Sequence, residues 1–282
     1  MIFFDDFTEQ LSESSCIQYA DDTVVYVTHD NVTVIDRILN DELGNLHSYF
    51  QENELILNLK KGKTETILFG TAKRLAKQTQ RTITVTIEGK PVHHVTSYTY
   101  LGNQLDSKLS LNDNFEKSYK KATGRLNLLT KLRSFLNVEA AFKVYEMVIV
   151  PIMMYSTFIS LQLTPTQQKK LKSLDNRARR VVGGDVTIKG IENRMKTKAA
   201  ILVKQCMDGN TCEQFKHYFE INNHIKSTRN GNKLMKLPKV KLEFGRKAFK
   251  FQGAKVYNEL PLIIRESKSS TDFREKLVAH FN

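Results

Sequence analysis

The chain has 282 residues, of which 40% are hydrophobic and 26% are charged, a composition that fits a globular protein with one large or two modest cores. Its three cysteines, Cys16, Cys206 and Cys212, are too few for a disulfide framework. We therefore expect a reducing, intracellular location, without distinguishing nucleus from cytoplasm. The first ten residues have no basic start and no cleavage site, so they do not resemble a signal peptide.

The longest apolar run, Met147 to Leu161, is interrupted by Pro151 and by polar residues. A membrane-spanning helix needs about 20 predominantly apolar residues. We expect this run to form a buried helix, and we expect no membrane partner.

The positive charge is concentrated in the second half of the chain. Residues 161–282 contain 26 Lys/Arg and 11 Asp/Glu, a net charge of +15, whereas residues 1–160 contain 17 and 19, a net charge of −2. Such a division indicates that the second half binds a polyanion, most simply nucleic acid, because phosphate contacts need no sequence motif. The alternative is a solvated basic surface.

The first hundred residues contain short β-prone runs around one helical segment. Two runs within 17–27 flank a polar turn and predict a hairpin, and apolar residues at helical spacing predict a helix over 31–53, capped by Asp30 or Asn31. The remaining elements that we expect are a strand at 66–69, a polar loop at 71–81, a hairpin with alternating residues 83–87, a turn at 88–91 and a return strand at 92–95, and a strand or tight turn at 97–105.

After residue 106 the spacing becomes helical. It predicts helices over 115–132 and over 138–152, the latter kinked at Pro151, and a last helix over 271–282. Thr164, Pro165 and Gln167 predict a capped helix start, and Gly183-Gly184 predicts its end. The fold class is therefore α+β, with a β-containing part up to about residue 106 and a mostly helical part after it.

The sharpest chemical signal is Asp21-Asp22 at the expected hairpin tip. Two adjacent carboxylates repel each other, and a hairpin tip offers little compensation. Such a pair makes sense if it binds a divalent cation, since Mg²⁺ takes one or two protein carboxylates together with substrate phosphates. Two such ions stabilise the attacking and leaving oxygens of nucleotidyl transfer. Alone, however, Asp-Asp in a turn is usually solvated turn chemistry.

The residues around this pair extend the signal. Residues 17–26, which read Ile-Gln-Tyr-Ala-Asp-Asp-Thr-Val-Val-Tyr, resemble the YADD box, motif C of the palm, of non-LTR (LINE-type) retrotransposon reverse transcriptases. Further resemblances follow in the family's order. They are residues 2–7 before the box, the helix at 31–53, the motif D-like segment 57–70, the primer-grip-like Tyr98-Thr99-Tyr100-Leu101-Gly102, the thumb-like 108–182 and the tail-like 229–265.

This resemblance implies a partial reverse-transcriptase palm at 1–106, a mostly helical thumb at 107–205 and a basic C-terminal tail at 206–282. It implies that Asp21 and Asp22 are catalytic and bind Mg²⁺ or Mn²⁺. It also implies that nucleotide and primer are bound by Tyr19, Lys63, Tyr100, Leu101 and Gly102. The basic face with Lys169, Lys172, Arg177 and Arg180 would then follow the backbone of an RNA template and DNA primer.

The family's palm has a further metal-binding aspartate before the YADD box, and the sequence shows no residue that matches it. The fingers are not matched either. We therefore expect a fragment of an RNA-directed DNA polymerase that uses dNTPs in the intact enzyme and does not polymerise alone. Exposed strand edges and poor solubility are also expected. The alternative is a non-catalytic remnant that binds nucleic acid through its basic thumb and tail. The sequence leaves the oligomeric state open.

Overall fold

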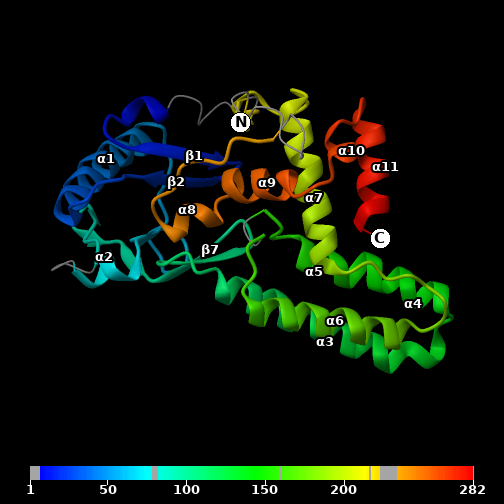
Figure 1. Ribbon diagram of the computed structural model, residues 1–282. Helices are drawn as coiled ribbons and strands as arrows, with labels where there is room; N and C mark the ends of the chain where they lie inside the picture. The colour runs from blue at the N-terminus through cyan, green and yellow to red at the C-terminus, as the bar shows by residue number, and fades with distance from the viewer. Residues whose placement is uncertain (1–6, 78–81, 159–160, 216, 223–233, 282) are drawn as a thin grey trace. The chain divides into compact units, whose positions relative to one another are not determined.

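The computed structural model describes residues 7–77, 82–158, 161–215, 217–222 and 234–281. The chain divides into two compact units, Met1–Ser110 and Leu111–Asn282 (Figure 1). Helices make up 55% of the structure and strands 12%, so the fold class is broadly α+β, as predicted. The division sharpens the charge asymmetry, because residues 1–110 contain 10 Lys/Arg and 15 Asp/Glu, net −5, and residues 111–282 contain 33 and 15, net +18.

The first unit combines short strands with one long helix. Its elements are the 3₁₀ turn Phe7–Gln10, β1 (Ser15–Tyr19), β2 (Asp22–Tyr26), α1 (Val32–Glu52), β3 (Glu65–Ile67), α2 (Ala72–Lys77), β4 (Thr86–Ile87), β5 (Lys90–Pro91), β6 (His93–Val95), β7 (Ser97–Tyr100) and β8 (Asn103–Asp106). The described strands form four two-stranded pairs, β1–β2, β3–β6, β4–β5 and β7–β8.

Helix α1 organises the core of this unit, and its bounds confirm the helix predicted over 31–53. Asn31 is the N-cap, because its side-chain oxygen accepts the backbone N–H of Thr33 at 3.0 Å. The helix buries one face against the hairpins, with Val32, Ile35 and Leu39 packed beside buried residues of the strand region 83–92. Burial of this face, and not helix propensity alone, stabilises α1.

The strand pairing differs from the prediction at 92–95. The hairpin turn is Glu88-Gly89, with positive φ at both residues, and the return strand is β5, which is shorter than expected. Residues 93–95 instead form β6, which pairs in parallel with β3. Parallel pairing joins segments that are distant in sequence, so no local turn residues predict it.

The prediction of a polar loop over 71–81 is also wrong in part, because residues 72–77 form helix α2. The Thr71 hydroxyl oxygen accepts the backbone N–H of Arg74 at 3.2 Å and caps this helix. Leu75 packs against the core of the unit, which explains why so polar a segment becomes helical. Residues 78–81 lie outside the described part.

The regular elements of the second unit are helices over its described residues, joined by non-helical segments that include one isolated β-bridge between Ile221 and Met235. Its elements are α3 (Asn112–Leu132), the 3₁₀ turn Arg133–Phe135, α4 (Val138–Val144), the π-helical turn Tyr145–Ile149, α5 (Val150–Met154), α6 (Pro165–Val182), α7 (Ile191–Met207), the 3₁₀ turn Glu213–Phe215, α8 (Glu243–Lys247), α9 (Phe249–Asn258), α10 (Leu262–Arg265) and α11 (Ser270–Phe281). Helices α3, α4 and α6 surround one core, and α7, α9 and α11 surround a second (Figure 1).

Helix α6 begins and ends as its sequence predicts. The Thr164 hydroxyl oxygen accepts the Gln167 backbone N–H at 3.3 Å, and the Gln167 side-chain oxygen accepts the Thr164 backbone N–H at 2.9 Å. This reciprocal pair is a capping box, with Pro165 at the first helical position. At the other end, the backbone of Gly183 has φ +68°, and its N–H bonds to the carbonyl of Arg179.

The apolar run 147–161 is not a uniformly buried helix, which corrects the prediction. Ile149, Val150 and Met153 are buried, but Met147 is 75% exposed and Tyr155 is 63% exposed. The irregularity expected at Pro151 takes the form of the π-helical turn just before it. Proline lacks the N–H of a regular helix and clashes with the preceding turn, so a wider turn accommodates it.

Helices α6 and α7 are joined by a buried carboxylate. The Asp175 side chain accepts the backbone N–H of Ile191 at 3.2 Å and the Tyr145 hydroxyl at 3.5 Å. Ile191 is the first residue of α7, whose N-terminal N–H groups need acceptors, so Asp175 fixes the start of that helix. Burial raises the pKa of Asp175 to about 6, although the Ile191 N–H and the neighbouring Arg179 and Arg194 lower it.

No helix within the described ranges is both long and apolar enough to cross a membrane.

Candidate functional site

The paired aspartates lie at the tip of the predicted hairpin. Strands β1 and β2 are antiparallel, with Tyr19 opposite Asp22, so Ala20 and Asp21 form a two-residue turn. Ala20 adopts φ +54°, a left-handed backbone that lets the chain reverse tightly. Both carboxylates are exposed, and the Tyr19 side chain is 64% exposed. The sequence predicted this turn and its strands correctly.

A buried glutamate of α1 anchors the base of the hairpin. The Glu42 side chain is 2% exposed and accepts the backbone N–H groups of Ser12 at 2.9 Å and Glu13 at 2.6 Å, together with the Ser12 hydroxyl at 3.1 Å. Burial raises the pKa of Glu42, but these hydrogen bonds outweigh it, so the pKa is lowered overall. The ionised Glu42 therefore holds the segment from which the hairpin starts.

The hairpin packs on the core with one face only. Cys16 and Val25 are opposite each other in the register and contact the buried residues of α1. The other face presents Ile17, 52% exposed, beside Tyr19 and Asp22. Among the described strands, β1 and β2 pair only with each other.

The acidic tip has some of the ligands that a metal cation needs. Carboxylate oxygens are the donors that Mg²⁺ prefers, and two exposed aspartates can supply one or two ligands beside substrate phosphates. Successive residues at a strand end point to opposite sides, so Asp21 and Asp22 do not automatically share one ion. Within the described part of the chain, no group of three or more His, Cys, Asp or Glu side chains is arranged to hold a metal.

Strand β7 lies within electrostatic reach of the acidic tip, because the Asp22 carboxylate acts on Tyr98. Burial, then the carboxylates of Asp22 and Glu65, raise the pKa of the half-buried Tyr98. The structure thus brings Asp22 near the first tyrosine of the segment 98–102, a proximity that the sequence did not reveal. The sequence indicates only the order of the two motifs along the chain, and this order does not predict the distance between Asp22 and Tyr98.

The predicted primer-contacting residues form a hairpin turn. Tyr100 pairs with Asn103, and between them Leu101 and Gly102 both have positive φ, +44° and +75°. A two-residue turn with two left-handed residues matches the twist of a hairpin, and Gly102 adopts it without strain. The Tyr100 hydroxyl is buried and has no hydrogen-bond partner among the described residues.

Lys63 lies in a separate, exposed basic turn. Its backbone N–H donates to the carbonyl of Lys60 at 3.0 Å, and Gly62 has φ +84°. The backbone N–H of Gly62 donates to the Glu65 carboxylate at 2.7 Å, which fixes the start of β3. The nucleotide-binding role of Lys63 stays a prediction.

The basic residues predicted on the thumb-like segment occupy the outer side of α6. The helix buries Leu171, Leu174, Ala178 and Val182, which lie on one face. Lys169, Lys172 and Arg180 are exposed on the remaining surface, and Arg177 is partly buried. In the described structure none of these four cations forms an ion pair or a side-chain hydrogen bond. Their charges are therefore available to an external anion.

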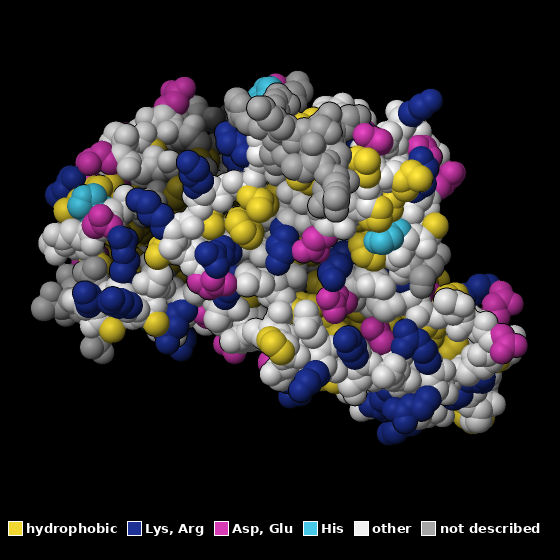
Figure 2. All heavy atoms as spheres, viewed as in Figure 1, with side chains coloured by type: hydrophobic (Ala, Val, Ile, Leu, Met, Phe, Trp, Pro, Cys, Tyr) yellow, Lys and Arg dark blue, Asp and Glu magenta, His cyan; other side chains and the backbone are white. Residues whose placement is uncertain are grey.

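Sequence reasoning missed a second group of exposed cations, on α3. The Lys170 ammonium of α6 is ion-paired with Glu116 of α3, which links the first turns of the two helices. Helix α3 then presents Lys117, Lys121 and Arg125 to solvent. Dark blue side chains gather over both helices in Figure 2. The spacing of four residues between these cations was the signal that could have found them.

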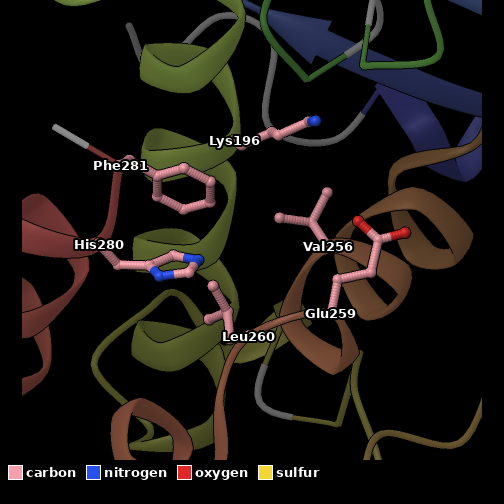
Figure 3. A pocket seen from close by; sticks show the side chains of 6 residues that line it. All are labelled: Lys196, Val256, Glu259, Leu260, His280 and Phe281. Carbon is pink, nitrogen blue, oxygen red and sulfur yellow. The ribbon is translucent and has the colours of Figure 1, made fainter.

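A small pocket of about 160 Å³ lies elsewhere in the second unit (Figure 3). Its lining combines charged and apolar side chains: Lys196, Val256, Glu259, Leu260, His280 and Phe281. Typical ligand pockets measure about 300–1,000 Å³. Lys196 is ion-paired with Glu192 at 3.1 Å, and Glu259 lies 4.0 Å from Lys255, so the charges of this pocket are already compensated.

Comparison with known protein families, with curated proteins and with solved structures finds no match to this chain. The resemblance to reverse transcriptases therefore depends on the motifs themselves.

Proposed function

We propose that this chain is part of a non-LTR retrotransposon reverse transcriptase and that, taken alone, it binds nucleic acid without polymerising. The observation that carries the binding proposal is the row of unpaired cations on α6, Lys169, Lys172 and Arg180. The partner is the phosphate backbone of an RNA template paired with a DNA primer. No structural feature of α6 reads a base sequence, so this contact is expected to be sequence-independent.

The physical basis of the binding is the release of counterions. Each phosphate that a lysine or arginine neutralises frees condensed cations. The logarithm of affinity therefore falls linearly with the logarithm of salt concentration, with a slope proportional to the number of contacts. A buried apolar face and a capping box hold α6 in place, so the backbone that carries these cations needs little ordering on binding. The excess of positive charge in residues 111–282 adds attraction at longer range.

The catalytic part of the proposal concerns the acidic tip. In the intact enzyme, Asp21 is a metal ligand and Asp22 is the auxiliary carboxylate, with Tyr19 and the 100–102 turn near the primer end. A bound Mg²⁺ or Mn²⁺ supplies charge stabilisation for nucleotidyl transfer from a dNTP. The residues of this chain contribute a rigid turn that fixes the two carboxylates. Two carboxylates on neighbouring residues make an incomplete two-metal site, which is why we expect no extension by this chain alone.

Primer extension on an RNA template with Mg²⁺ tests the catalytic part, using the chain and its Asp21→Asn variant. The expected result is no extension by either protein. Extension by the chain that disappears in the variant would contradict the inactivity and would support the enzyme assignment. Extension that is equal in both proteins would contradict the role given to Asp21.

Salt-dependent binding tests the other part. The logarithm of affinity for an RNA–DNA duplex is measured against the logarithm of salt concentration for the chain and for the double variant Lys169→Gln/Lys172→Gln. The double variant is expected to reduce the slope by roughly 2, since each duplex phosphate contact contributes about 0.9. Lys143→Gln is the matched control, because this exposed lysine of α4 is already ion-paired with Glu139 at 2.7 Å. An unchanged slope in the double variant would refute the interface.

The alternative function is a non-catalytic nucleic-acid-binding remnant that uses the basic helices and tail. Binding that survives Asp21→Asn unchanged, with no metal dependence of any measured property, would favour this alternative. A change in Mg²⁺ affinity on Asp21→Asn would favour the enzyme assignment.

A further inference from the structure

The outer face of α3 changes character along its length. Its first half is cationic and its second half is apolar, and the apolar stripe continues into the 3₁₀ turn that follows the helix. The residues are Lys117, Lys121 and Arg125, then Leu128, Leu132 and Phe135. The apolar side chains are 47%, 45% and 83% exposed, respectively.

The cations of this face are uncompensated. Lys117, Lys121 and Arg125 form no ion pair and no side-chain hydrogen bond within the described structure, although Glu116 on a neighbouring face of the same helix is ion-paired with Lys170. Residues four apart on a helix lie one above the other. The three cations therefore form a single line that leads to the apolar stripe.

Phe135 is held in place and yet exposed. The guanidinium of Arg133 donates from Nε to the carbonyls of Val181 at 2.9 Å and Val182 at 3.2 Å, which ties the turn to the end of α6. Asn137 caps α4 on the other side, accepting the backbone N–H of Ala140 at 2.8 Å. The ring of Phe135 thus projects into solvent from a turn that is fixed at both ends, so binding requires little additional ordering.

Three exposed apolar side chains on one continuous face are a patch, which marks an interaction surface more often than isolated exposed residues do. The adjoining line of cations identifies the chemistry of the partner. A second copy of the chain is disfavoured by like charge, because residues 111–282 carry a net charge of +18. Nucleic acid supplies both phosphates for the cations and flat apolar bases for the ring.

We infer that α3 binds the boundary between a duplex and an unpaired strand, with Lys117, Lys121 and Arg125 on phosphates and Phe135 stacked on an unpaired base. This inference rests on the proposed function and adds the kind of nucleic-acid structure that the site selects. Within a fully paired duplex the base faces are stacked on one another, so a ring that lies along the helix cannot reach them. An unpaired base offers an accessible face, and aromatic stacking on it is independent of sequence.

The test compares two RNA–DNA probes, a blunt duplex and the same duplex with a short single-stranded overhang that carries 2-aminopurine beside the junction. The proteins are the chain, Phe135→Ala, Phe135→Tyr and the control Ile263→Ala, which removes a side chain that is 71% exposed on α10. Affinity is measured at several salt concentrations, together with 2-aminopurine fluorescence. Because Phe135 is exposed, Phe135→Ala is expected to leave the melting temperature unchanged.

The expected result is that Phe135→Ala weakens binding of the overhang probe by roughly 5- to 150-fold, with an unchanged salt slope and loss of the fluorescence change. Phe135→Tyr and Ile263→Ala should bind as the unaltered chain does. Equal binding of Phe135→Ala and the unaltered chain would overturn the inference while leaving the proposed function intact. A protein dimer that Phe135→Ala dissociates would also overturn it. Failure of the unaltered chain to bind either probe would overturn both.

Discussion

Asp175 offers a direct test of how the second unit is held together. Its carboxylate is 6% exposed, and its hydrogen bonds to Ile191 and Tyr145, 3.2 and 3.5 Å long, are too extended to compensate burial fully. The pKa of Asp175 is consequently raised from 3.8 to about 6. The folded protein therefore holds this proton more tightly than the unfolded chain does.

The tighter binding of this proton in the folded state sets the direction in which stability changes with pH. Between pH 4 and pH 6 the unfolded chain has released the proton while the folded protein keeps it, so the free energy of unfolding falls as pH rises through this range. The two pKa values, 3.8 and about 6, differ by about two pKa units, and each unit is worth about 1.4 kcal/mol. Asp175 is therefore expected to cost roughly 3 kcal/mol of stability at neutral pH relative to acid pH.

The perturbation is Asp175→Asn, which keeps the size of the side chain and an oxygen that accepts the Ile191 N–H but removes the titration. Urea unfolding, followed by circular dichroism between pH 4 and pH 7, measures the stability of both proteins. Relative to the unaltered chain, the variant should gain up to about 3 kcal/mol over this range. Asp185→Asn, an exposed aspartate after α6, is the control and should show no such gain.

Two results would refute the reasoning about Asp175. A stability difference that is independent of pH would mean that burial does not perturb the carboxylate. A variant that loses most stability at pH 7 would mean that an ionised Asp175 stabilises the fold through Arg179 and Arg194.

Three further predictions concern the elements that hold the hairpin and α6. Glu42→Gln should lower the free energy of unfolding by about 1–3 kcal/mol at pH 7, since the ionised carboxylate accepts the N–H groups of Ser12 and Glu13. Because the pKa of Glu42 is lowered from 4.5, this loss should shrink as pH falls below that value, which thermal melts at pH 3 and pH 7 would check. Ala20→Gly should raise stability by about 1 kcal/mol in urea unfolding, because φ is +54° there, and an unchanged midpoint would argue against a strained turn. Thr164→Ala should cost about 1 kcal/mol in the same assay by removing half of the capping box, whereas no loss would show that α6 does not depend on its cap.

Local signals explain the parts of the fold that the sequence predicted. Helix α1 has apolar residues at helical spacing and a side-chain cap at Asn31, and α6 has Thr164 and Gln167 at its start and Gly183 at its end. The hairpin β1–β2 was predictable for the same reason, since its turn residues lie between two β-prone runs. Each of these caps and turn residues lies within a few residues of the helix or hairpin that it defines.

Elements that depend on distant partners were not predictable in this way. Strand β6 pairs with β3 across more than twenty residues, and no pattern in 93–95 distinguishes that partner from β4. Helix α2 forms because Leu75 packs against the core, and the polar sequence around Leu75 does not predict that contact. Exposure of Met147 and Tyr155 in an apolar run likewise depends on what packs around them.

The candidate site shows the same limit. The sequence named Asp21, Asp22 and the cations of α6, but the unpaired state of those cations is a property of the folded surface. The proximity of Asp22 to Tyr98 and the exposure of Phe135 also arise only from tertiary structure.

The opposite charges of the two units make the chain an electric dipole. A polyanion attracts residues 111–282, net +18, and repels residues 1–110, net −5, before any atom is in contact. The encounter is thereby oriented, and the basic helices arrive first. Association should then be fast at low ionic strength and slow steeply once the Debye length falls below about 10 Å, near 0.1 M salt. Charge alone therefore favours first contact between a polyanion and residues 111–282.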